Sequence, residues 1–167
     1  MENNQLQIKI EDKKIKSCAL TGHRDLPDDF DVEKLRKNLK NLIENGVFIF
    51  YNGLAKGFDL LSAEVLLSLK KKYKNVKIIA CIPCLEQEKY YKEEDKKRYY
   101  QVLKNVDERI ILSEKYYKGC MLQRDKHMVD KADVLLAYLK KETGGTAYTV
   151  KYFQKKYPLK EIYFFNR

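Results

Sequence analysis

The sequence predicts a single α/β domain with a doubly wound, mainly parallel sheet that carries helices on both faces. Apolar runs of strand length alternate with amphipathic helical stretches along the whole chain, and this order is typical of parallel sheets. With 167 residues, the chain has room for one domain with a proper core and is short for two. We expect a polar N-terminal segment over residues 1–14 and the domain over residues 15–167.

Six strands and five helices follow from the hydrophobic pattern. The expected strands are 15–20, 47–51, 76–82, 108–112, 133–138 and 160–165. The expected helices are 31–45, 58–73, 86–105, 118–130 and 146–156. In the helix at 58–73, apolar residues recur at i, i+3 and i+4 spacing, which indicates one buried face.

The charge balance makes a polyanionic partner worth weighing. The chain has 34 basic and 24 acidic residues, for a net charge of +10. Most of the basic residues are lysines scattered along the helical stretches, whereas dedicated phosphate sites favour the bidentate fork of arginine. We therefore favour a solvated lysine-rich surface and keep nucleic acid as an alternative partner.

Nothing in the hydrophobic pattern indicates a membrane protein. No apolar run approaches the roughly 20 residues that span a bilayer, and the first 14 residues lack the pattern of a secretory signal. We expect a cytoplasmic protein without a membrane partner.

Three glycine-bearing junctions follow predicted strands and precede predicted helices. They read Thr21-Gly22-His23-Arg24, Gly53-Leu54-Ala55-Lys56-Gly57 and Gly144-Gly145-Thr146. Helix starts leave backbone N–H groups unpaired, and glycine has no Cβ to keep a phosphate away from them. Because the carboxyl ends of parallel strands lie at one edge of a sheet, the junctions predict one shared anion-binding rim. The chain has no G-x-G-x-x-G, Walker A or G-x-S-x-G motif, which disfavours dehydrogenases, P-loop NTPases and α/β-hydrolases.

Five motifs in this order resemble the YpsA-like family of the SLOG superfamily. They are Thr21-Gly22-His23-Arg24, Gly53 to Asp59 with Ala63-Glu64, Ile82-Pro83 with Gln87, Arg124 with Met128-Val129-Asp130, and Gly144-Gly145-Thr146. This superfamily includes the LOG phosphoribohydrolases and the DNA-processing protein DprA. The resemblance implies a Rossmann-like fold, a pocket for a nucleotide or nucleotide-derived ligand, and a homodimer as a common assembly.

In such a pocket the first junction would face the phosphate. The backbone of Thr21 and Gly22 would approach it closely, and Arg24 would neutralise its charge. His23 would bond a sugar or base, or else have a structural role. The third junction, with Gly144, Gly145 and Thr146, would offer free N–H groups to the same phosphate.

The second junction and its helix supply further candidates. Gly53 and Gly57 are expected to adopt positive φ and to permit a close helix start. Asp59 would cap this helix or bond a sugar hydroxyl. Glu64 falls on the apolar stripe of the helix, so its carboxylate must be paired or turned into the pocket.

Arg124, which resembles the functional arginine of the LOG enzymes, and Glu64, with its carboxylate on an apolar stripe, are the candidate catalytic residues, but the LOG motif is incomplete. LOG enzymes continue Gly-Thr-x-x-Glu, and that register places Thr149 where the glutamate would stand. The two preceding glycines of the motif are replaced by Glu142 and Thr143. We therefore expect a binding module for an ADP-ribose-like ligand, a sensor or regulatory protein, without a metal or a cofactor. The alternatives are a nucleoside-monophosphate N-glycosidase and a DprA-like single-strand nucleic-acid binder.

Two other features of the sequence allow more than one interpretation. Cys81-Ile82-Pro83-Cys84 has C-x-x-C spacing, which we interpret as structural, with a redox pair or a metal site as the other options, because no second ligand pair is present. The run from Glu88 to Tyr100 is rich in lysine and tyrosine. It predicts a surface helix with tyrosine anchors, or a surface on which bases stack.

Overall fold

The computed structural model describes residues 15–165, which form one α/β domain; the predicted segment 1–14 lies outside them. All strand pairs are parallel, and the six strands lie in the order β4-β3-β2-β1-β5-β6. Their bounds are β1 Lys16–Gly22, β2 Val47–Asn52, β3 Lys77–Ile82, β4 Glu108–Ile111, β5 Val134–Tyr138 and β6 Glu161–Phe164. The predicted strands and their parallel arrangement are confirmed.

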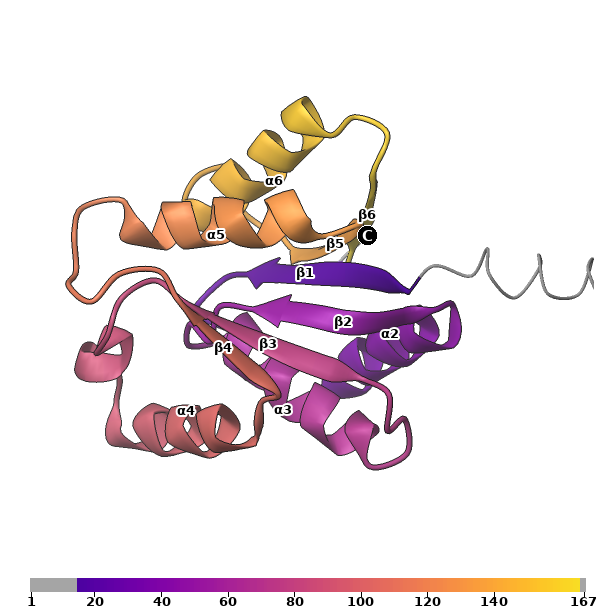
Figure 1. The fold of residues 1–167 in the computed structure, drawn as a ribbon, viewed down its shortest axis with the longest axis horizontal. Helices are drawn as coiled ribbons and strands as arrows, with labels where there is room; N and C mark the ends of the chain where they lie inside the picture. Colours follow the sequence, from indigo (N-terminus) through magenta and orange to yellow (C-terminus); the bar gives the residue numbers. More distant parts are fainter. Residues whose placement is uncertain (1–14, 166–167) are drawn as a thin grey trace, which may run out of the picture.

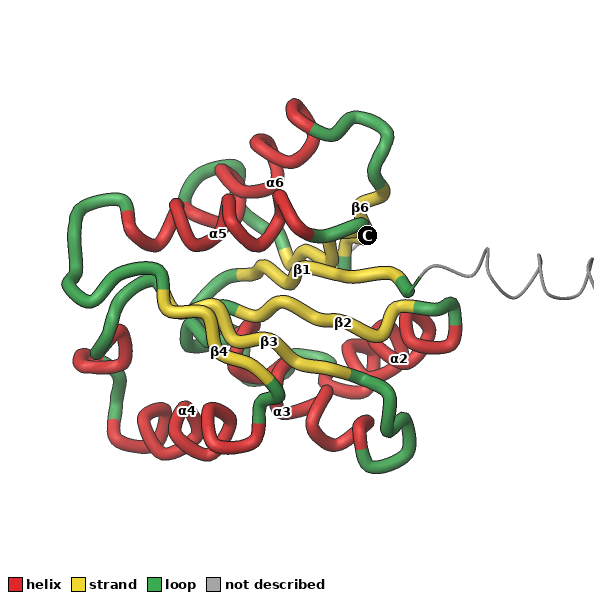
Figure 2. Tube along the Cα trace, in the orientation of Figure 1, coloured by secondary structure: helices red, strands yellow, loops and turns green. Residues whose placement is uncertain are grey.

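Helices cover both faces of the sheet, as expected for a doubly wound fold (Figure 1). One face carries α2 (Val32–Glu44), α3 (Phe58–Lys70) and α4 (Glu93–Asn105), and the other carries α5 (Cys120–Lys131) and α6 (Gly145–Lys156). Figure 2 shows that each strand up to β5 leads through a loop into the next helix. Within residues 15–165, no helix is both long and apolar enough to cross a membrane.

The helix predicted at 86–105 is wrong as a single element. The structure has a 3-10 turn, η1 (Gln87–Tyr90), and then α4, separated by Tyr91 and Lys92 in extended conformation. The Tyr91 hydroxyl donates to the backbone oxygen of Leu54 at 3.2 Å, and its ring packs edge-on against Tyr99. These tertiary contacts replace a continuous helix.

The core lies in layers on the two faces of the sheet. In β1, Cys18 and Leu20 pack toward α2 and α3, whereas Ala19 between them packs toward α5 and α6. This alternation is the period of two that a strand imposes on its side chains. The strand order reverses between β1 and β5, which is the position where open α/β sheets form a crevice at the carboxyl ends of their strands.

Candidate functional site

A cleft of about 200 Å³ lies at the carboxyl ends of the central strands. All three glycine-bearing junctions and α5 contribute to it. Its lining residues are Thr21, Gly22, His23, Arg24, Ala55, Asp59, Met121, Leu122, Arg124, Asp125, Gly145 and Thr146. Of the residues predicted from sequence, Gly53, Gly57, Glu64 and Gly144 are not among them. The predictions omitted Ala55, Met121, Leu122 and Asp125.

The start of α6 has no capping side chain and borders the cleft. Gly144 precedes the helix with φ of 96°, and no side chain caps it. The first hydrogen bond of the helix runs from the Tyr148 N–H to the Gly144 carbonyl at 3.0 Å, which leaves the earlier N–H groups without helical partners. A Cβ at Gly145 would meet no atom within 4 Å. Positive φ therefore requires glycine at position 144, while position 145 has free space beside the cleft.

The β1 junction is held by backbone contacts. A Cβ at Gly22 would collide with the ring of Phe58, and one at Gly57 would collide with the backbone of Arg24. The Phe58 N–H also donates to the His23 carbonyl at 3.1 Å. Gly22 and Gly57 therefore let the first and second junctions pack against each other, and the Arg24 side chain stays exposed at the mouth of the cleft.

His23 connects the first junction to the loop that follows β5 and precedes the third junction. Its Nε2 accepts from the backbone N–H of Lys140 at 2.7 Å and of Lys141 at 3.3 Å. Burial lowers the pKa of His23, and the two lysine charges lower it further. Because an imidazole nitrogen can accept only when it is unprotonated, His23 is held neutral and its structural role is the one that the geometry supports.

The prediction of positive φ is confirmed for Gly57, at 83°, and is wrong for Gly53; Leu54 has φ of 54° instead. Gly53 is needed for another reason, because a Cβ there would collide with the guanidinium of Arg124. The buried Asn52, which sequence reasoning missed, shapes this loop. Its amide donates to the Asp59 carbonyl at 2.8 Å and its Oδ1 accepts from the Leu54 N–H at 2.8 Å.

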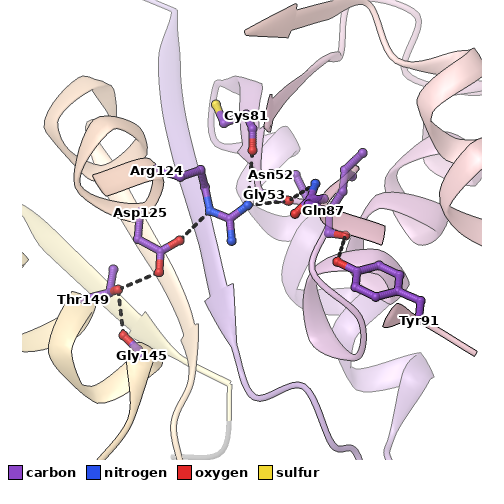
Figure 3. A network of polar contacts seen from close by, with 10 residues as sticks. Asn52, Gly53, Cys81, Gln87, Tyr91, Arg124, Asp125, Gly145 and Thr149 are labelled. Atoms are coloured by element: carbon purple, nitrogen blue, oxygen red, sulfur yellow. Dashed lines mark hydrogen bonds and ion pairs between the residues drawn. The ribbon is translucent and has the colours of Figure 1, made fainter. Parts of the chain in front are cut away.

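Arg124 lies on α5, and its side chain is buried against the ends of β2 and β3 (Figure 3), with 2% of its surface exposed. Its Nε donates to Asp125 Oδ1 at 2.7 Å, and its Nη1 donates to the carbonyls of Gly53 at 2.6 Å and Cys81 at 3.2 Å. Burial acts to lower the pKa of Arg124, but Asp125 and Asp59 raise it above its usual value. Most of the guanidinium is thus engaged in joining α5 to the ends of β2 and β3, a structural role that the sequence did not predict for Arg124.

Asp59 is a buried carboxylate that lines the cleft. It does not cap α3, which begins after Gly57 without a side-chain cap. Burial raises the pKa of Asp59 to about 7, against the lowering effect of Arg124. Its Oδ1 has no hydrogen-bond partner in the part of the chain that the structure describes. Such an oxygen costs free energy until a donor reaches it.

We predict that Asp59→Asn stabilises the ligand-free protein at pH 8. A pKa raised from 3.8 to about 7 means that the folded state binds this proton more tightly, so the carboxylate costs stability increasingly as pH rises from about 4 to 7. The full penalty is present above pH 7. Removing it is expected to raise the free energy of unfolding by about 2–4 kcal/mol at pH 8, and by less as the pH falls toward 4.

Denaturant unfolding of Asp59→Asn and of the natural protein, at pH 8 and again at about pH 4, measures this difference in the free energy of unfolding. Asp28→Asn, at an exposed carboxylate, is the matched control and should change little. Equal stability of Asp59→Asn and the natural protein at pH 8 would mean that the Asp59 carboxylate is already satisfied.

A second carboxylate lines the cleft beside Asp59. Asp125 accepts from Arg124 through Oδ1 and from the Thr149 hydroxyl through Oδ2, at 3.3 Å (Figure 3). The Thr149 hydroxyl also contacts the Gly145 carbonyl, at 2.8 Å. Position 149 thus supplies a buried hydroxyl, and the acid at this end of the cleft comes from α5. The signal in the sequence that could have revealed Asp125 was its position directly after Arg124, a residue that the sequence had already singled out.

Glu64 lies outside the cleft. Its carboxylate pairs with Arg98 of α4, which also contacts Asp95 at 3.2 Å. About a third of the Glu64 side chain is exposed in this pair. Of the two options that the sequence left open for this carboxylate, the structure shows the paired one.

The cysteines of the C-x-x-C motif are free and buried. Burial raises the pKa of Cys81 to about 12, and it also raises the pKa of Cys84. Thiolates are therefore scarce at neutral pH, which argues against a reactive redox pair. Across residues 15–165, no three His, Cys, Asp or Glu residues cluster in a way that could hold a metal ion.

Comparison with protein-family models assigns the chain. The YpsA model, described as the YspA SLOG family, matches residues 31–166. The chain belongs to this family. The UPF0398 protein YpsA of Bacillus subtilis (strain 168) is 28% identical over 156 residues, which cover 85% of this chain and 86% of that protein.

Solved structures share the fold of this YpsA-family protein. DprA from Streptococcus pneumoniae superposes with a TM-score of 0.63 at 19% identity, over 91% of this chain and 50% of that one. DprA from Helicobacter pylori, described with a single-stranded DNA binding mode, has a TM-score of 0.64 at 22% identity, over 90% of this chain and 65% of that one. The protein spans half to two thirds of these DprA chains, and the similarity shows a common Rossmann-like fold.

Proposed function

We propose that this protein binds a nucleotide or a nucleotide-derived ligand of the ADP-ribose type in the cleft, as a sensor or regulatory module. The observation that carries the proposal is the buried Asp59, whose Oδ1 has no partner among residues 15–165, in the same cleft as the uncapped start of α6. An acceptor beside an anion-binding helix start is the combination that a sugar phosphate needs. Membership of a SLOG family supports the same ligand class.

Each part of the ligand has a complementary group. The phosphate would accept from the N–H groups of Gly145 and Thr146, with the exposed Arg24 as its countercharge. A sugar hydroxyl would donate to Asp59 Oδ1. Arg124 has a positioning role: its charge lowers the pKa of Asp59, and its bond to the Gly53 carbonyl holds the loop that leads into α3, where Asp59 lies.

We predict that such ligands raise the melting temperature of the protein. A ligand at 100 times its Kd stabilises the folded state by about 2.7 kcal/mol, which corresponds to roughly 5–10 °C for a domain of this size. Thermal unfolding with ADP-ribose, AMP and ribose 5-phosphate is the measurement, and free adenine and sulfate serve as controls. The proposal is wrong if none of the three shifts the transition at millimolar concentration.

A second candidate function is N-glycosidase activity on a nucleoside monophosphate. It is favoured by two carboxyl groups in one cleft, Asp59 with a pKa of about 7 and Asp125, because general acid–base chemistry uses groups poised near neutral pH. Against it, Thr149 stands where LOG enzymes have glutamate, and a lost acid or base typically removes about 10²- to 10⁴-fold in rate.

We predict that incubation with AMP releases no adenine above background. Liquid chromatography of the mixture over hours measures the release, and a LOG enzyme assayed in parallel verifies the conditions. Robust release that Asp59→Asn abolishes would replace the binding-module proposal with an enzyme whose acid or base is Asp59.

A further inference from the structure

A second groove, of about 610 Å³, adjoins the cleft through Met121, which lines both. Its walls come from η1 with the loop before it and from the segment that precedes α5. Two tyrosines line it from opposite sides: Tyr90 is 89% exposed and Tyr116 is 69% exposed. Large aromatic rings left in solvent beside a cleft offer faces on which a planar ligand can stack.

Gln87 at this groove has an unsatisfied acceptor. The residue is 7% exposed, and its Nε2 donates to the Gly53 carbonyl at 3.2 Å and contacts the Tyr99 hydroxyl at 3.3 Å. Because the Gly53 carbonyl can only accept, the amide nitrogen must face it, and this fixes the orientation of the amide. Its Oε1 is buried and lacks a partner among the residues that the structure describes. A donor from a ligand would satisfy it.

The volumes indicate that a nucleotide needs both spaces. The cleft with Asp59 holds about 200 Å³, below the roughly 300–1,000 Å³ of sites for drug-sized ligands. It suits a phosphorylated sugar, whereas a base attached to that sugar must extend beyond it. The groove that continues past Met121 supplies the space, an acceptor and aromatic faces.

We propose, building on the proposed function, that this groove is the base subsite and that it selects a base with an exocyclic amino group, such as adenine. The amino group donates to Gln87 Oε1, and the ring stacks on Tyr90 or Tyr116. A base with a carbonyl at the same position places one acceptor against another and is rejected. The protein is then specific for amino-bearing nucleotides and not for sugar phosphates in general.

Calorimetric titration with ribose 5-phosphate, AMP and IMP tests this subsite, because AMP and IMP differ at the amino group and the adjacent ring nitrogen. We expect AMP to bind at least about 10-fold more tightly than IMP. Tyr90→Ala or Tyr116→Ala, whichever removes the tyrosine on which the ring stacks, should weaken AMP binding by about 5-fold or more and leave ribose 5-phosphate binding unchanged. Tyr163→Ala, at a tyrosine of β6 that is 43% exposed, is the control and should change neither.

Gln87→Leu should remove the preference for AMP over IMP, and the tyrosine variants, whose side chains are exposed, serve if Gln87→Leu does not fold. Equal affinities for AMP and IMP, or tyrosine variants without effect, overturn the base subsite. If ribose 5-phosphate binds in that case, the proposed function stands without the subsite. If none of the three ligands binds, both proposals fall.

Discussion

Arg124→Ala is expected to destabilise the protein by about 3–5 kcal/mol, the range found when one partner of a buried ion pair is removed. The change leaves the Asp125 carboxylate without its cation and leaves the carbonyls of Gly53 and Cys81 without a donor. It also opens a cavity between α5 and the sheet edge. This loss is a large part of the roughly 5–15 kcal/mol that stabilises an ordinary domain.

Urea unfolding monitored by circular dichroism measures the loss. Arg36→Ala is the matched control, because Arg36 forms a partly exposed pair with Glu33, and pairs of that kind contribute at most about 1 kcal/mol. Similar small changes for both variants would show that the Arg124 network contributes little to the fold. Since Arg124→Ala acts on folding, Arg24→Ala is the better probe of charge at the mouth of the cleft.

Gly145→Val is expected to abolish nucleotide binding while the protein stays folded. Position 145 has no positive φ and has open space where a Cβ would stand, so a side chain there meets no protein atom close to its Cβ. The added methyl groups would occupy the space in front of the free N–H groups of α6, where we place the phosphate. Titration with AMP or ADP-ribose, after circular dichroism has verified the fold, measures the effect.

Two controls sharpen this result. Glu93→Val adds the same side chain at the first residue of α4, away from the cleft, and should leave binding intact. Any salt-sensitive association with single-stranded DNA should survive Gly145→Val, because such binding rests on many phosphate contacts over a surface. Full AMP affinity in the folded Gly145→Val variant would place the phosphate elsewhere and refute the assignment of the α6 start.

The sequence by itself determined the architecture, because strand and helix periods are local properties of the chain. Alternating apolar residues such as Cys18 and Leu20, and the i, i+3, i+4 stripe of α3, correspond to faces that the structure buries. The glycine-bearing junctions could likewise be located at one edge of the sheet, since parallel strands with helical crossovers put all such turns on the same side. The predicted helix over 86–105 failed where Tyr91 packs onto a loop distant in sequence.

Only the tertiary structure decided what each residue of the site does, because burial and hydrogen-bond partners come from segments far apart in the chain. The absence of a side chain at Gly22 and Gly53 leaves the space that Phe58 and Arg124 occupy. Arg124 became a buried connector, and Glu64 was paired with Arg98 on another surface. The raised pKa of Asp59 and the unpaired oxygens of Asp59 and Gln87 depend on desolvation by neighbouring elements, which no local pattern in the sequence encodes.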